Sequence, residues 1–236
     1  MWSFLGIGAQ KAGTTWLYSQ LERHLQLAFP LGKEAHFWDR PHNATAIAGY
    51  LSQFANNADV AGEMTPSYAT LPISVVREIH ACNPHLRLIY LIRNPIDRAW
   101  SSALMALQRA QMTLDEASDA WFSDHFHSAA SRKRGDYQAC LQTWREVFPK
   151  QQMLVLRFEQ ITNEPEVLIN RCFQHLGVAP LDPEQLRQHG CREKIFAGPG
   201  YPLRPSLKPV LQNLYEDKIK ILARYLDMDL DAWLDD

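Results

Sequence analysis

The stretch Gly8-Ala9-Gln10-Lys11-Ala12-Gly13-Thr14-Thr15 follows a short apolar run at residues 2–7 and leads into a segment of helical periodicity. This order predicts a strand, a tight loop and a helix. Small residues let backbone N–H groups converge on an anion, and the helix N-terminus adds positive potential. Lys11 contributes a full charge, and Thr14 and Thr15 carry hydroxyl donors. The stretch therefore predicts a phosphate-binding loop after the first strand.

The spacing of Gly8 and Gly13 matches the phosphate loop of nucleoside triphosphatases, G-x-x-x-x-G-K-[ST]. Thr14 stands where that motif has its lysine, and the lysine of this chain lies inside the loop at position 11. The shift argues against a site for a γ-phosphate and magnesium but preserves a cradle for a 5′-phosphate. A tight turn with a solvated Lys11 is the alternative interpretation.

A second motif, Arg93-Asn94-Pro95-Ile96-Asp97-Arg98-Ala99-Trp100-Ser101, follows an apolar run at 87–92. Asn94 suits a helix N-cap, Pro95 the first helical position and Asp97 the first turn. Arg93 would then lie at the carboxyl end of a sheet, where open α/β folds bind ligands. A guanidinium and the Ser101 hydroxyl can grip a phosphate. The alternative is a capped helix in which Arg93 pairs with Asp97 and Ser101 is incidental.

Both motifs resemble those of the sulfotransferases that use 3′-phosphoadenosine 5′-phosphosulfate (PAPS). Residues 10–17 are similar to the 5′-phosphosulfate loop, P-K-[AST]-G-[ST]-[ST]-W/A-L, although Gln10 replaces the commoner proline, and residues 93–101 match R-N-P-x-D-x-x-x-S. The resemblance implies that Arg93 and Ser101 bind the 3′-phosphate and that Lys11 is also catalytic, near the leaving oxygen. The implied nucleotide-binding residues of the first loop are Gln10, Lys11, Ala12, Gly13, Thr14, Thr15 and Trp16.

Residues 32–39, Gly-Lys-Glu-Ala-His-Phe-Trp-Asp, resemble the K-E-x-H-F-F segment of carbohydrate-type and related bacterial sulfotransferases. The resemblance implies that Glu34 is the general base that takes the acceptor proton, a role that suits a carboxylate whose pKa is raised by partial burial. His36 is the alternative base, because histidine side chains titrate close to neutral pH. A surface pair of Lys33 with Glu34, beside a packed His36 and Trp38, is the interpretation without function.

Residues 62–68 resemble the family segment E-K-[ST]-P-x-Y, with Met64 in place of its lysine. Either Lys33 replaces that cation or the acceptor pocket is drier. Glu63 and Tyr68 are expected to border the pocket, or else to form a strand-end cap and a packed ring.

The loop at 190–205 lacks the basic K-G-R-x-Y element that in relatives closes over the 3′-phosphate and adenine, since residues 197–201 read Ala-Gly-Pro-Gly-Tyr. Arg192, Lys194 and Arg204 are the cations nearby, and Arg192 or Arg204 could compensate. Tyr201 could lie against the nucleotide.

The chain of 236 residues suits one α/β, P-loop-like domain over 1–236, with a central parallel sheet of about four or five strands flanked by helices. Strands are predicted at 2–7, 87–92 and 153–158, with weaker ones near 59–62 and 27–31. Helices are predicted at 14–25, 72–82, 95–110, 136–148, 165–177 and 206–226, a helical cover at 111–135, and loops at 39–57 and 190–205.

Composition and charge argue against a nucleic-acid-binding or membrane-spanning protein. The net charge of −2 gives no basic field for nucleic acid, and no apolar run approaches the roughly 18 residues of a membrane span. Met1 leads straight into the first strand, which predicts a cytoplasmic protein without a transmembrane segment. The four cysteines show no metal-like spacing and are expected to be reduced.

The resemblance implies an enzyme that moves a sulfuryl group from PAPS to a hydroxyl or amine by in-line displacement. The product would be adenosine 3′,5′-bisphosphate (PAP), no metal would be needed, and the acceptor would be a small molecule, a carbohydrate or a lipid. A P-loop small-molecule kinase and a non-catalytic adenine-nucleotide-binding protein are the alternatives.

Overall fold

The structure, a computed structural model, describes residues 1–55, 60–193, 195 and 200–235. The chain divides into two compact units. The first comprises Met1–Ile92 and Thr143–Phe196, and the second Arg93–Gln142 and Ala197–Asp236. A single domain over 1–236 stays a prediction.

The first unit is built on a parallel sheet of five strands in the order β2-β3-β1-β4-β5. Strand β1 lies at its centre, and Phe4 and Leu5 are 0% exposed because helices cover both faces. This confirms the predicted α/β class and parallel sheet. The strands are β1 (Trp2–Gly8), β2 (Leu27–Ala28), β3 (Val60–Met64), β4 (Arg87–Ile92) and β5 (Met153–Arg157).

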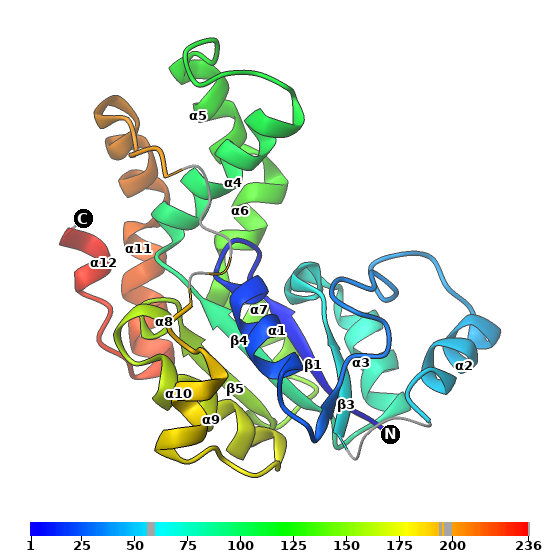
Figure 1. The fold of residues 1–236 in the computed structure, drawn as a ribbon. Helices are drawn as coiled ribbons and strands as arrows, with labels where there is room; N and C mark the ends of the chain where they lie inside the picture. The colour runs from blue at the N-terminus through cyan, green and yellow to red at the C-terminus, as the bar shows by residue number, and fades with distance from the viewer. Residues whose placement is uncertain (56–59, 194, 196–199, 236) are drawn as a thin grey trace. The chain divides into compact units, whose positions relative to one another are not determined.

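Helices lie on both faces of this sheet (Figure 1). The connection from β1 to β2 through α1 runs in the opposite direction across the sheet from the connection from β3 to β4 through α3, so right-handed crossovers place α1 and α3 on opposite faces. Helix α9 packs beside α1 and against β4 and β5. The helices of this unit are α1 (Thr14–Glu22), α2 (Ala44–Ser52), α3 (Ile73–Cys82), α8 (Gln160–Asn163), α9 (Pro165–Leu176) and α10 (Pro183–His189), with the 3-10 turns η1 (Pro66–Thr70) and η2 (Lys150–Gln152).

The second unit is helical. Helix α4 packs against α5, α6 and α11, and the indole of Trp100 contacts the ring of Phe122 at 4.9 Å. The helical cover predicted at 111–135 is confirmed by α5 and α6. The elements are α4 (Pro95–Arg109), α5 (Asp119–His127), α6 (Ala129–Gly135), η3 (Pro205–Leu207), α11 (Lys208–Leu226) and α12 (Ala232–Asp235); α7 (Tyr137–Arg145) begins here and ends in the first unit.

The predicted loop at 39–57 is wrong over α2. Asn43 caps this helix by accepting a hydrogen bond from the backbone N–H of Ala46 at 2.9 Å. Tyr50 is the buried residue of the helix, so the sequence carries almost no apolar periodicity there. The helix predicted at 14–25 ends at Glu22, three residues early, and the one predicted at 136–148 ends at Arg145. No helix in the described part of the chain combines the length and hydropathy needed to cross a membrane.

Candidate functional site

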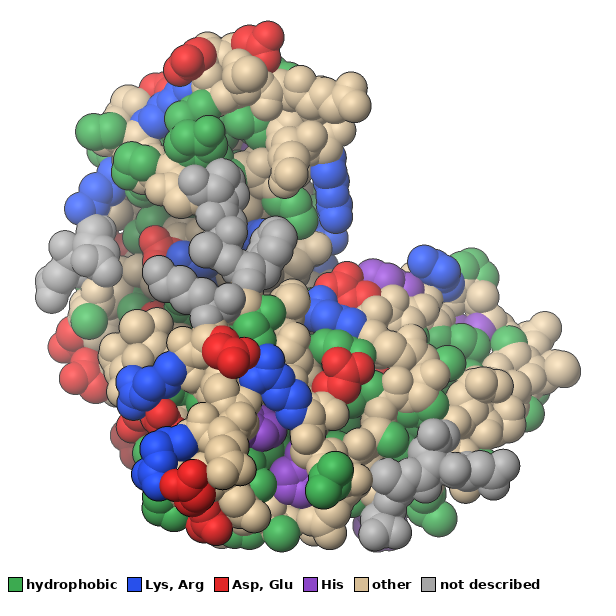
Figure 2. Space-filling view, in the orientation of Figure 1, with side chains coloured by type: hydrophobic (Ala, Val, Ile, Leu, Met, Phe, Trp, Pro, Cys, Tyr) green, Lys and Arg blue, Asp and Glu red, His purple; other side chains and the backbone are tan. Residues whose placement is uncertain are grey.

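Charge on the molecular face seen in Figure 2 is mixed, with basic and acidic side chains interspersed. An anion site on this face must therefore be built locally, from backbone donors and single cations. The loop at 8–13 has that construction. Ala9 N–H donates to the carbonyl of Leu91 at 2.7 Å, which ties the loop to the carboxyl end of β4.

Gly13 closes this loop in a conformation that suits glycine alone. Its φ of 91° lies in the left-handed region, and a Cβ atom there would approach Cδ1 of Ile161 to 2.5 Å. Lys11 also has a positive φ, 70°, and is half-buried. Glycine at position 13 therefore lets the loop pack closely on Ile161 and Phe158.

The N-terminus of α1, which follows Gly13, has the properties of an anion site. No described side chain caps it, and its first turn holds no acidic residue. The first N–H groups of a helix have no acceptor within the helix, so they are available to a phosphate. Asn43, Asn94 and Asp182 cap α2, α4 and α10, whereas α3, α9 and α11 also begin without a side-chain cap, so α1 differs from them by following the glycine loop.

The predicted donor-binding residues differ in exposure. Gln10 and Thr15 are half-buried, and Gln10 Oε1 is buried with no hydrogen-bond partner among the described residues. Thr14 is 5% exposed. Ala12 and Trp16 are buried in the core, so their side chains pack inside the protein and only their backbone groups could contact a nucleotide.

A second group of predicted residues lies at the carboxyl end of β3. Lys33 forms a parallel bridge with Met64, and Glu34 N–H donates to the Met64 carbonyl at 2.9 Å. Met64 also pairs with Gly6 of β1, the strand that leads into the phosphate-type loop. Segment 33–39 is thus bridged to the carboxyl end of β3, and loop 8–13 follows the neighbouring strand β1, so both lie at the carboxyl edge of the sheet.

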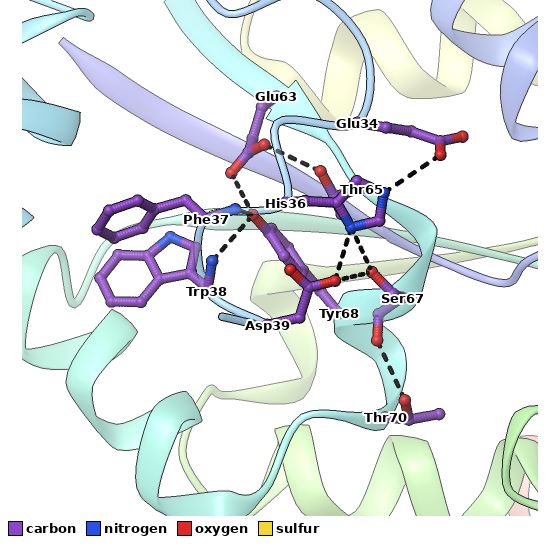
Figure 3. A network of polar contacts seen from close by, with 10 residues as sticks. All are labelled: Glu34, His36, Phe37, Trp38, Asp39, Glu63, Thr65, Ser67, Tyr68 and Thr70. Carbon is purple, nitrogen blue, oxygen red and sulfur yellow. Dashed lines mark hydrogen bonds and ion pairs between the residues drawn. The ribbon is translucent and has the colours of Figure 1, made fainter. Parts of the chain in front are cut away.

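Segment 33–39 carries a chain of polar contacts, and Figure 3 shows its part from Glu34 to Asp39. The Lys33 ammonium contacts Glu34, and His36 Nε2 lies 3.5 Å from Glu34 Oε2. On its other side His36 Nδ1 is 2.7 Å from Asp39 Oδ2, which also accepts a hydrogen bond from the Ser67 hydroxyl at 2.5 Å. The imidazole thus lies between two carboxylates, and the Glu34 side chain is 42% exposed.

The pKa of Glu34 corrects one expectation. Partial burial raises it, but the hydrogen bonds and charges of Lys33 and His36 outweigh burial and hold the pKa below its ordinary value. The expected rise toward neutrality is therefore wrong, because cations stand beside the carboxylate. The pKa of Asp39 is also lowered, since bonds from Ser67 and His36 outweigh its burial.

Asp39 and Ser67 were not singled out by sequence reasoning. The i, i+3 spacing of His36 and Asp39 was a usable signal for the first. Ser67 is 31 residues from His36 in the chain and reaches it only through the packing of η1 at the strand ends. Glu63 and Tyr68 are 0% exposed, so the packed ring is the arrangement observed.

The second unit contains the other predicted phosphate ligands. Asn94 caps α4 by accepting from Ile96 N–H at 3.0 Å, and Pro95 opens the helix, as predicted. Arg93 Nη2 lies 3.3 Å from Asp97 Oδ2, the ion pair of the alternative interpretation. Ser101 is half-buried on α4. Their binding to a 3′-phosphate stays a prediction.

The candidate cations of the C-terminal loop are engaged with carboxylates. Arg204 bonds Asp119 Oδ1 at 2.7 Å and the Leu114 carbonyl at 2.6 Å, and Arg192 pairs with Glu166 at 2.8 Å. Tyr201 is 50% exposed, and its carbonyl accepts from the Trp100 indole at 2.8 Å. Lys194 lies outside the described residues. Nucleotide contacts by Tyr201 and Arg204 stay predictions.

Comparison with known proteins identifies the family. The profile of the sulfotransferase domain matches residues 3–192. The chain belongs to the sulfotransferase domain family. Among relatives of this sulfotransferase-family chain, the human heparan sulfate glucosamine 3-O-sulfotransferase 6 is 28% identical over 185 residues, which cover 73% of this chain and 51% of the relative. The chain thus spans about half the length of the curated relatives it matches.

Solved sulfotransferases share the fold. A sulfotransferase from Alicyclobacillus acidocaldarius aligns with a TM-score of 0.73 at 22% identity, covering 99% of this chain and 98% of that one. Mouse sulfotransferase SULT7A1, complexed with PAP, aligns with a TM-score of 0.62 at 15% identity, covering 96% and 88%. The predicted P-loop-like fold is thereby confirmed.

Proposed function

We propose that this chain transfers a sulfuryl group from PAPS to a hydroxyl or amine of a carbohydrate, lipid or small-molecule acceptor. One observation carries the proposal. A phosphate-type loop follows β1, and a carboxylate–imidazole cluster is bridged to the carboxyl end of β3, the strand that pairs with β1, in a chain of the sulfotransferase family. Neither element alone would indicate group transfer.

The donor is assigned to two sets of residues. Loop 8–13 and the N-terminus of α1 fit a 5′-phosphosulfate, because an uncapped helix end and Lys11 together favour a dianion. Thr14 and Thr15 add hydroxyl donors. Arg93 and Ser101 are assigned to the 3′-phosphate; the Arg93 guanidinium has five N–H donors, so its contact with Asp97 through Nη2 is compatible with phosphate binding.

The transfer step is an in-line displacement at sulfur. The acceptor oxygen, or the nitrogen of an amine acceptor, forms a bond to sulfur while the bond from sulfur to the 5′-phosphate oxygen breaks. Lys11 and the N–H groups of loop 8–13 stabilise the charge that develops on the leaving phosphate. The acceptor proton passes to the base, and PAP leaves. This proposal needs no metal.

Glu34 is the proposed base. Its carboxylate is partly exposed and ionised at neutral pH, so it can accept a proton, although its lowered pKa makes it a weaker base than the sequence led us to expect. His36 contacts Glu34 on one side and Asp39 on the other, so it can hold the carboxylate in place and share the proton. The alternative assignment, in which His36 itself takes the proton, predicts a different mutant profile.

The test is transfer of labelled sulfate from PAPS across hydroxyl and amine acceptors by the wild-type chain, Glu34→Gln and Lys11→Ala. Loss of a general base lowers kcat by roughly 10²–10⁴-fold, and we expect Glu34→Gln to do so without weakening PAP binding. Lys11→Ala should weaken both transfer and PAP binding. Lys150→Ala removes an exposed lysine of η2 and is the matched control.

Three outcomes decide between the candidates. If Glu34→Gln retains activity and His36→Asn loses it, His36 is the base. Binding of PAP without transfer to any acceptor would indicate the non-catalytic alternative. Transfer of phosphate from ATP would indicate a kinase.

Carbohydrate hydroxyls are the first acceptors to screen, because the similar human protein is named for a glucosamine 3-O transfer. Lipid and small-molecule hydroxyls follow. The cytoplasmic location and the absence of a nucleic-acid partner stay predictions from the sequence.

A further inference from the structure

A buried carboxylate lies on β3 one residue before Met64, whose carbonyl accepts the hydrogen bond from Glu34 N–H. Glu63, on β3, is 0% exposed. Its Oε1 accepts hydrogen bonds from the hydroxyls of Tyr50 at 2.5 Å and Tyr68 at 3.1 Å, and its Oε2 accepts from Thr65 at 3.0 Å. Burial of a carboxylate is unfavourable unless such donors surround it, so this arrangement needs an explanation.

Tyr68 connects this carboxylate to segment 33–39. Its hydroxyl oxygen accepts hydrogen bonds from the backbone N–H groups of Phe37 at 2.9 Å and Trp38 at 3.2 Å (Figure 3). A phenol has one proton, and two N–H donors occupy its oxygen, so the proton must point to Glu63. The buried carboxylate therefore fixes the direction in which Tyr68 can accept.

The segment held in this way has an unfavourable backbone. Glu34 has a φ of 64° and His36 a φ of 53°, both in the left-handed region that non-glycine residues rarely adopt. Such conformations persist where the surrounding structure over-determines them. On one side of these two residues Glu34 N–H bonds Met64, and on the other Phe37 and Trp38 bond Tyr68.

We propose that Glu63 and Tyr68 are positioning residues for sulfuryl transfer. Glu63 orients the Tyr68 hydroxyl, and Tyr68 holds segment 33–39 in the strained conformation that keeps Glu34 beside Lys33 and His36. Both side chains are buried and act through the segment. This inference rests on the proposed function.

Tyr50 provides a matched control. Its hydroxyl donates to the same Glu63 oxygen, and its ring stacks on Phe37 at 4.4 Å. Among the described residues its hydroxyl bonds none of the backbone N–H groups of segment 33–39. Tyr50→Phe and Tyr68→Phe therefore each remove one hydroxyl donor to Oε1 of Glu63, and only the second also removes the acceptor of the two N–H groups.

The experiment compares these two variants in sulfate transfer, PAP affinity, thermal stability and amide exchange. Tyr68→Phe should lower kcat by roughly tenfold or more while PAP affinity stays within about twofold, because the base moves and the donor loop does not. The acid limb of kcat/KM should move to higher pH, because Glu34 would move away from Lys33 and His36, which lower its pKa. Tyr50→Phe should keep kcat within about threefold.

Glu63→Gln and Glu63→Leu extend the test if Tyr68→Phe does not fold. Glutamine keeps an oxygen for both tyrosines, and its amide can donate to Thr65 once that hydroxyl turns. Glu63→Gln should thus keep kcat and the acid limb, whereas Glu63→Leu should lose the activity.

The results separate the two proposals. A wild-type chain that transfers no sulfate to any acceptor overturns the proposed function. An active wild type whose two tyrosine variants lose equal kcat, or whose acid limb is unmoved in Tyr68→Phe, overturns the positioning role. Faster exchange of the Phe37 and Trp38 amides in Tyr68→Phe alone supports it, and unchanged protection contradicts it.

Discussion

Glu34 and Glu63 lie at the two ends of one polar network and have opposite properties. Glu63 is fully buried among neutral hydroxyl groups, and burial raises its pKa despite the hydrogen bonds from Tyr50, Thr65 and Tyr68. Glu34 is partly exposed, and the nearby Lys33 and His36 lower its pKa. The two carboxylates thus differ in their burial and in the charge of the side chains around them.

The difference separates two roles. A carboxylate that can reach an acceptor and stays ionised can take a proton, whereas one enclosed by hydroxyls can only accept fixed hydrogen bonds. The sequence leaves Glu63 either at the border of the pocket or as a strand-end cap; its complete burial fits the proposed role as a support for the segment that carries Glu34. Substitutions of either Glu63 or Glu34 test this difference.

The largest expected effect is on stability. Glu63→Leu leaves the buried hydroxyls of Tyr50, Tyr68 and Thr65 without their acceptor, which should lower the free energy of unfolding by about 3 kcal/mol or more. Glu34→Leu changes a partly exposed side chain and should alter it by less than about 1 kcal/mol. Urea unfolding of both variants gives the comparison. Equal decreases in the free energy of unfolding would show that the two carboxylates contribute equally to stability, which would contradict this prediction.

The sequence predicted much of the fold because its signals were local. The apolar runs at 2–7 and 87–92 and the Asn94-Pro95 cap act within a few residues, and the structure places strands and a helix there. Helix α2 was missed because a single buried ring gives no periodicity. Boundaries differ by up to three residues where apolar patterns outlast the helix.

The candidate site was only partly predictable for a physical reason. Loop 8–13 and the pair Glu34 and His36 are contiguous motifs. The contacts of Ser67 with Asp39 and of Tyr68 with Phe37 and Trp38 join residues about thirty positions apart, and they depend on the register of β3 against Lys33. Sequence spacing does not encode that register, nor the pKa of Glu34 that follows from it.

The second expected effect is a dependence of stability on pH. A carboxyl whose folded pKa is raised contributes stability that is present below its unfolded pKa, ordinarily 4.5, and that is lost as pH rises through the folded value. Glu63→Gln does not titrate, so its stability relative to wild type should improve as pH rises from about 4.5. Urea unfolding between acid and neutral pH measures this. A constant difference between the two proteins would contradict the raised pKa.

The smallest expected effect concerns the charge beside the base. Lys33→Met removes one cause of the lowered pKa of Glu34, so the acid limb of kcat/KM should move to higher pH. At neutral pH Glu34 remains ionised, and activity there should fall less than about threefold. Lys150→Met, a change at the exposed η2 turn before the amino end of β5, should leave the profile unchanged.

A larger loss in Lys33→Met, uniform across the pH range, would have a different meaning. Met64 stands where the resembling motif has a lysine, and Lys33 lies opposite it in the parallel bridge. A uniform loss would show that Lys33 acts on the sulfuryl group itself, in place of that lysine. A shift confined to the acid limb would show that its charge acts through Glu34, which is the outcome expected from their direct contact.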